Sequence, residues 1–179
     1  MQLSNLFTKA GVLALAATVS ASPVPDLETR GLSGFEQQML DAQNWYRSQH
    51  SASPLSWDYN LASNAQYWAN QCTTGHQPNN YYGENLAWGS GWVSNYDWAN
   101  IWGSERVSYD FNNPGYSGYS GHFTQVVWKG SRSVGCAWAS CAFGYNVVCE
   151  YDPYGNVMGE FWNNVGYQVS GWPSDEYWA

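Results

Sequence analysis

Four cysteines constrain the fold of this 179-residue chain more than any other feature: Cys72, Cys136, Cys141 and Cys149. In an exported protein an even number of cysteines predicts two disulfides, and four cysteines allow three pairings. Zinc is the alternative, but the chain has no CxxC pair and its spacings are poor for a zinc finger. The prediction of disulfides therefore depends on export.

The N-terminus has the pattern of a secretory signal peptide. Lys9 precedes the apolar run AGVLALAATVSA, and Val19 and Ala21 fit the small-residue cleavage pattern. We expect a signal peptide at 1–21, a flexible leader or pro-segment at 22–33, and a secreted, extracellular protein. The run is too short for a membrane anchor, and no later stretch approaches a spanning length, so no membrane span is expected.

Charge narrows the range of partners. The formal net charge is −8, and Lys and Arg form no cluster. Phosphate binding needs a basic patch, so neither nucleic acid nor an anionic membrane surface is expected as a partner. The length suits a single domain, and a hydrophobic fraction of 44% with 18% aromatic residues is enough for a packed core.

Two amphipathic segments open the domain. Apolar residues recur at helical spacing over 35–50, and again over 58–72, where Asp58 is the expected N-cap. The second pattern places Cys72 on the buried face at the end of that helix. A Gly/Asn-rich loop is expected over 73–93, and loops of this length are often functional.

A third helix is expected over 94–110, with one face made by Trp98, Ile101, Trp102 and Glu105. A carboxylate in line with two tryptophans lies either at the rim of the face or partly buried with a partner. A short helix follows in HFTQVVWK. The segments SVGCAWASC and YNVVCEYDP alternate like strands, with a turn around Gly144, so helices come first and strands last. This order predicts an α+β domain.

Several short motifs together resemble one secreted family. YGENLAWG (82–89), GHFTQVVW (121–128) and VVCEYDPYGNVMGE (147–160) are similar to the signatures of the CAP superfamily, which contains cysteine-rich secretory proteins, insect antigen 5 and plant class 1 pathogenesis-related proteins. The resemblance implies a CAP domain over 34–166 with a C-terminal tail at 167–179. It also implies an α–β–α sandwich with a three-stranded antiparallel sheet between helical layers.

The chain most resembles the fungal branch of this superfamily, because the loop before GHFTQ lacks the extra cysteine pair of plant members. The resemblance implies the bridges Cys72–Cys141 and Cys136–Cys149. Glu150 stands where the family often has Asn, and Tyr154 where Pro is common; neither change is expected to touch the central site.

The resemblance also implies a tetrad lining a central cavity: His76, Glu84, Glu105 and His122. Imidazoles and carboxylates suit a divalent cation, zinc or magnesium, although no cofactor is expected to be required. The set could also polarise a water, or act only as a hydrogen-bonded cluster that pins two long loops. No other nucleophile motif appears, so catalysis is not expected. His50 matches no motif and is interpreted as a surface or packing residue.

The loop before GHFTQ carries four aromatic residues spaced like the caveolin-binding-type pattern of the family's sterol binders: Tyr109, Phe111, Tyr116 and Tyr119. Rigid rings suit a flat apolar plate with one hydroxyl, although they could instead pack on the third helix. The expected function is to bind and export or sequester sterols, and also fatty acids. The alternatives are a weak cation-dependent hydrolase that uses the tetrad, and a secreted effector or signalling protein, or precursor of a C-terminal peptide, recognised by a host or cell-surface receptor.

Overall fold

The computed structural model describes residues 31–179. The predicted signal peptide and nearly all of the predicted leader therefore lie outside the described residues. Within residues 31–179, no helix is long and apolar enough to cross a lipid bilayer.

The first two helices begin at caps that can be identified from the sequence. Helix α1 (Gly34–Gln49) starts with a capping box in which the Ser33 side chain and the Glu36 carboxylate each accept from the other's backbone N–H. Helix α2 (Tyr59–Ala69) starts at Asp58, as predicted, whose carboxylate accepts from the next turn. Helix α2 ends earlier than expected, because Cys72 has a φ of 52° and lies past the helix.

The sheet has four strands in the order β1-β3-β4-β2, one more than expected. The strands β2 (Gly83–Gly89), β3 (Ser133–Cys141) and β4 (Gly144–Asp152) pair antiparallel. The additional strand, β1 (Ser56–Trp57), is two residues long and pairs parallel with β3 at the edge. The class is α+β as predicted, but the sheet is mixed, and the expectation of three purely antiparallel strands is wrong in this respect.

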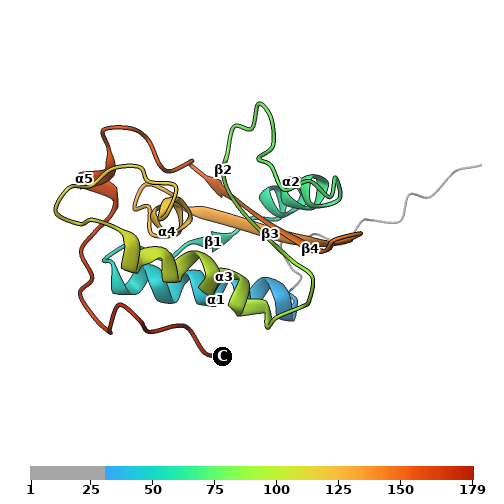
Figure 1. The fold of residues 1–179 in the computed structure, drawn as a ribbon, viewed down its shortest axis with the longest axis horizontal. Coiled ribbons are helices and arrows are strands. Elements are labelled where there is room, and N and C mark those ends of the chain that lie inside the picture. The colour runs from blue at the N-terminus through green and yellow to red at the C-terminus, as the bar shows by residue number, and fades with distance from the viewer. Residues whose placement is uncertain (1–30) are drawn as a thin grey trace, which may run out of the picture. The chain divides into compact units, whose positions relative to one another are not determined.

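Helices cover both faces of the sheet, as Figure 1 shows. Helix α2 packs on one face, where small residues such as Ala65 and Ala137 allow a close approach. Gly135 permits this contact, because a Cβ there would lie 2.1 Å from the backbone nitrogen of Ala62. Helices α1 and α3 (Asn95–Gly103) lie on the other face, over the main aromatic core.

Two expectations about the middle of the chain need correction. The expected loop over 73–93 contains strand β2, which forms through pairing with β4, distant in sequence. The third helix ends at Gly103 and continues as the 3-10 helix η2 (Ser104–Ser108). Trp98 and Trp102 are buried as predicted, whereas Ile101 is 48% exposed, because it points away from the face that packs on α1.

Two short helices complete the domain, α4 (Gly121–Val126) and α5 (Phe161–Asn164). The two bridges are those implied by the resemblance. Cys72–Cys141 joins the segment after α2 to the end of β3, and Cys136–Cys149 joins β3 to β4. No free cysteine remains among the described residues.

Candidate functional site

The four tetrad residues form two separate histidine–glutamate pairs. His76 Nδ1 lies 2.6 Å from Glu84 Oε1, and His122 Nδ1 lies 2.6 Å from Glu105 Oε1. Within residues 31–179, no three His, Cys, Asp or Glu side chains gather closely enough to form a metal-ligand cluster. The four residues are therefore brought to one region, but as two pairs.

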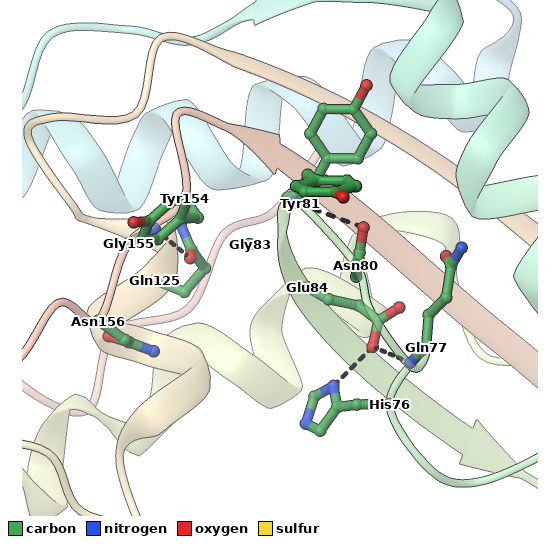
Figure 2. A pocket seen from close by; sticks show the side chains of 11 residues that line it. His76, Gln77, Asn80, Tyr81, Gly83, Glu84, Gln125, Tyr154, Gly155 and Asn156 are labelled. Atoms are coloured by element: carbon green, nitrogen blue, oxygen red, sulfur yellow. Dashed lines mark hydrogen bonds and ion pairs between the residues drawn. The ribbon is translucent and has the colours of Figure 1, made fainter.

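The first pair joins the loop before β2 to the start of that strand. Glu84 is only 5% exposed and also accepts from the backbone N–H of Gln77, so its carboxylate fixes the loop that carries His76 (Figure 2). The hydrogen bond to Glu84 raises the pKa of His76, which is itself mostly exposed. This carboxylate thus orients the imidazole and favours its charged form.

The second pair joins η2 to the start of α4. Glu105 Oε2 accepts from the backbone N–H groups of His122 and Phe123, while Oε1 bonds the imidazole of His122. These two backbone donors belong to the first turn of α4, where N–H groups have no partner within a helix. Glu105 is thus partly buried with partners, one of the two positions that the sequence allowed, and it acts as a cap supplied by another element.

Two cavities adjoin the pairs. A small one of about 60 Å³ is lined by His76, Glu84, His122 and Tyr116, among others, so both imidazoles reach the same space. A larger groove of about 510 Å³ lies beside it. In Figure 2, His76 and Glu84 stand on one wall of this groove, and Gln125 and Tyr154 on the facing wall. The groove combines tyrosine rings with amides and has few charges.

Both departures from the family pattern reach this region, contrary to expectation. Tyr154 lines the groove. Glu150 is fully buried in β4, accepts from the side chains of Asn64 and Asn80, and interacts with Glu84. Burial, and the charge of Glu84 beside it, raise the pKa of Glu150 above its usual range. Sequence reasoning missed this contact because it depends on the register Glu84↔Glu150 between β2 and β4.

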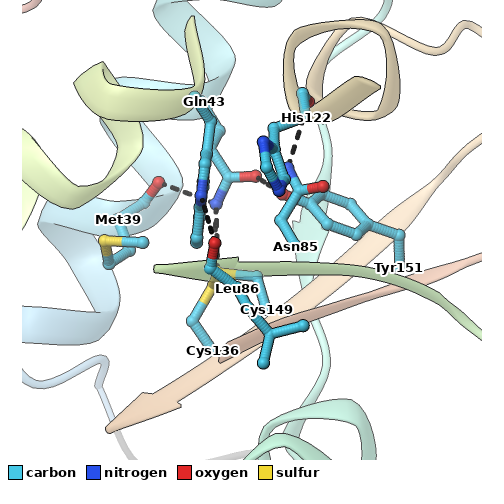
Figure 3. Close-up of a disulfide and its surroundings, with 9 residues drawn as sticks. Met39, Gln43, Asn85, Leu86, His122, Cys136, Cys149 and Tyr151 are labelled. Atoms are coloured by element: carbon cyan, nitrogen blue, oxygen red, sulfur yellow. Dashed lines mark hydrogen bonds between the residues drawn. A yellow bond between two sulfur atoms is a disulfide. The ribbon is translucent and has the colours of Figure 1, made fainter. Parts of the chain in front are cut away.

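A buried polar chain connects the site to the disulfide Cys136–Cys149 (Figure 3). Asn85 donates to the carbonyl of His122 and to the hydroxyl of Tyr151, which in turn donates to Gln43 Oε1. The Gln43 amide also lies within 3.8 Å of both sulfurs. Each of these buried polar groups has partners, so the backbone at His122 is supported from beneath.

The aromatic loop divides into a buried and an exposed part. Tyr109 is 7% exposed and Phe111 is partly buried, and both rings pack against Phe123 in the core. Tyr116 and Tyr119 are 59% and 83% exposed. The spacing that groups the four rings in the sequence therefore does not place them on one surface.

The exposed part of the loop lies beside a cavity of about 370 Å³, whose lining includes Tyr109, Pro114, Tyr116 and Ser120. Ser120 is fully buried, and its hydroxyl has no hydrogen-bond partner in residues 31–179. No spacing pattern pointed to Ser120, because an unpaired buried hydroxyl is visible only in three dimensions.

His50 is a packing residue, the second of its two proposed roles. It is fully buried, its ring stacks on Phe111 at 5.7 Å, and Nδ1 donates to the carbonyl of Gly166. Burial lowers the pKa of His50 to about 4, which keeps the imidazole neutral at pH 7.

Comparison with known proteins agrees with this architecture. The family model described as "Cysteine-rich secretory protein family" matches residues 40–151. The chain is similar to "Secreted protein PRY1" of Candida albicans, with 42% identity over 74% of this chain and 32% of that protein. It thus spans about a third of that relative's length.

A plant protein and a solved structure are similar over most of their lengths. "Pathogenesis-related protein 1C" of Nicotiana tabacum is 42% identical over 70% of this chain and 79% of its own. The crystal structure of NaASP2 with Zn2+ matches with a TM-score of 0.64 and 25% identity, covering 78% of this chain and 90% of that one. By its motifs, its fold and these matches, the chain belongs to the CAP, or cysteine-rich secretory protein, family.

Proposed function

We propose that this chain is a secreted carrier that binds sterols, and other small apolar lipids, at the aromatic loop. One observation carries the proposal: the cavity of about 370 Å³ has a tyrosine ring at its edge, and Ser120, one of its lining residues, has a covered hydroxyl without a partner in residues 31–179, which movement of the loop would have to expose to a ligand. A sterol has a flat apolar body and one hydroxyl, which is the combination such a lining suits.

The exposed rings give the apolar body a surface to contact. Tyr116 and Tyr119 are two of the most accessible side chains near the cavity, and aromatic rings supply large contact area with little loss of rotamer entropy. Gly115 and Gly118 have open space where a Cβ would lie, so the outer part of the loop has room to rearrange.

Titration of the mature protein with a fluorescent sterol tests the proposal. A Tyr116→Ala, Tyr119→Ala double variant should bind roughly 10- to 100-fold more weakly, since each ring contributes about 1 kcal/mol or more. The matched control is Tyr67→Ala, because Tyr67 is 59% exposed, as Tyr116 is, and lines none of the three cavities described above. An equal loss in the double variant and in this control would remove the loop from the binding site.

A divalent cation is a second candidate ligand, for which the two histidine–glutamate pairs are the specific observation. Each carboxylate engages Nδ1 of its histidine and leaves Nε2 free, and both imidazoles line the cavity of about 60 Å³. Carboxylates that fix the far nitrogen in this way are the usual support for zinc-binding histidines. We propose that His76 and His122 would supply nitrogen ligands to zinc there.

Calorimetry with zinc or magnesium and the double variant His76→Ala, His122→Ala tests the cation site. The variant should lose zinc binding and keep most of its sterol binding, because Tyr116 is the one residue shared by the cavity of about 60 Å³ and the loop cavity of about 370 Å³. We propose no catalytic role for these residues. Hydrolysis that disappears in the double variant would argue for the hydrolase alternative.

A further inference from the structure

The last part of the chain is bound along the domain as an extended strap, defined as residues 166–178. It follows α5 without forming a helix or strand, and Figure 1 shows it returning past α1. Backbone groups at both ends are bonded: the N–H of Val169 donates to Gln49 O, and Tyr177 exchanges two hydrogen bonds with the side chain of Asn100. The strap is thus attached at several points along its length.

A buried arginine donates three hydrogen bonds to the strap. Arg106 is 2% exposed and donates to the carbonyls of Trp172, Pro173 and Asp175. Its guanidinium also lies over the ring of Tyr46, 5.1 Å from the centroid. A guanidinium presents five donors in a fixed geometry, and here they donate to three strap carbonyls and to the side-chain oxygen of Gln49.

The strap also holds the aromatic loop directly. The ring of Tyr167 stacks on Phe111 with centroids 5.6 Å apart, and its hydroxyl donates to Asn112 Oδ1. His50, which is bonded to the strap at Gly166, also stacks on Phe111. Phe111 is thus contacted by two groups that belong to the strap or are bonded to it.

These two attachments flank the point at which the loop begins. Arg106 lies on η2, which ends at Ser108, and the loop starts at Tyr109. The strap therefore fixes the element that leads into the loop and Phe111, the second ring of the loop that packs in the core. A movement of the loop that displaces Phe111 therefore has to separate its ring from Tyr167.

We propose that the strap is a clamp that keeps the aromatic loop closed, and that release of Tyr167 from Phe111 opens the loop. The further step, in which the opened loop admits a lipid, rests on the proposed function. The clamp itself is a property of the protein without ligand.

Hydrogen exchange of the ligand-free protein tests the clamp. The amides of Asn113 and Ser120 donate within the loop, to Asp110 O and Ser117 O, and report its opening. Tyr167→Ala should speed exchange at both amides roughly fivefold to tenfold, since it removes one aromatic pair. Tyr167→Phe keeps the ring and should stay close to the parent protein. If these two amides exchange in Tyr167→Ala at the same rate as in the parent protein, the clamp proposal is wrong.

Controls separate the clamp from general loosening and from the proposed function. Trp172→Ala changes an exposed side chain of the strap but keeps the carbonyl that Arg106 binds, so loop exchange should not change. Amides of the β3–β4 pairing should be unaffected in every variant; faster exchange there as well would mean global destabilisation and would overturn the clamp. The association rate of a fluorescent sterol should rise by the same factor in Tyr167→Ala. If neither protein binds sterol, the proposed function fails, whereas loop exchange still decides the clamp.

Discussion

The carboxylate of Glu105 should be a principal source of stability, whether or not the tetrad binds a cation. It accepts three hydrogen bonds: one from the imidazole of His122 and two from backbone N–H groups in the first turn of α4. The substitution Glu105→Gln keeps the shape of the side chain but removes the charge and leaves an amide nitrogen facing donors. The variant therefore tests the structural role of the pair directly.

The expected loss follows from these bonds. A hydrogen bond to a charged group contributes about 1.5–3 kcal/mol, and glutamine retains one acceptor oxygen for part of the set. Because the Glu105 side chain is 21% exposed, water compensates some of the loss. We expect the free energy of unfolding to fall by about 2 kcal/mol, or roughly 6 °C in Tm for a domain of this size.

Urea denaturation and thermal scans at pH 7 with a chelator present measure this loss without a cation. Glu160→Gln is the matched control, since Glu160 is exposed and its side chain makes no capping bond to α5. Glu105→Gln within about 0.5 kcal/mol of this control would refute the reasoning, because surface substitutions usually fall in that range.

Three further predictions concern stability. Burial lowers the pKa of His50 to about 4, so between pH 6.5 and pH 4 the unfolded chain binds a proton more readily than the folded one. The free energy of unfolding should therefore fall by about 3 kcal/mol as the pH drops from 6.5 towards 4. If His50→Gln shows the same dependence on pH as the parent protein, this prediction is wrong. Replacing Cys72 and Cys141 by serine should lower the free energy of unfolding by about 4 kcal/mol, and removing the other bridge, which closes a shorter loop, should lower it by about 3 kcal/mol. If urea denaturation gives the larger loss for the shorter loop, chain entropy does not explain the stabilisation. Gly135→Ala should be strongly destabilising, because its Cβ would meet the backbone of α2, whereas Gly34→Ala, with open space, should be nearly neutral; similar Tm values for the two would be inconsistent with that contact.

Local patterns predicted the parts of the fold that depend on neighbours in the sequence. The N-cap at Asp58 and the burial of Trp98 and Trp102 follow from spacing and capping chemistry. Strand β2 was missed because its flanking glycines and polar residues resemble a loop, and only pairing with β4 makes it a strand. Ile101 was wrongly predicted to be buried, because the apolar spacing of a helix does not show which part of its apolar face another element covers.

The candidate site was predictable only through resemblance to a family. Spacing alone gives no reason to connect His76 with Glu84 or Glu105 with His122, because loops and strand pairing bring them together. The aromatic loop shows the opposite case. Its spacing suggested one surface, yet Tyr109 and Phe111 complete the core and only Tyr116 and Tyr119 remain accessible.

The way Arg106 holds the strap has an evolutionary consequence. It contacts main-chain carbonyls, which every residue type presents, so substitutions at outward-facing positions such as Trp172 leave the attachment intact. A segment recognised through its backbone can therefore diverge in sequence while it keeps its path. The family match ends at residue 151, before the strap begins. Straps of the same kind in relatives would be found by looking for a buried arginine that faces the C-terminus, rather than by aligning the tails.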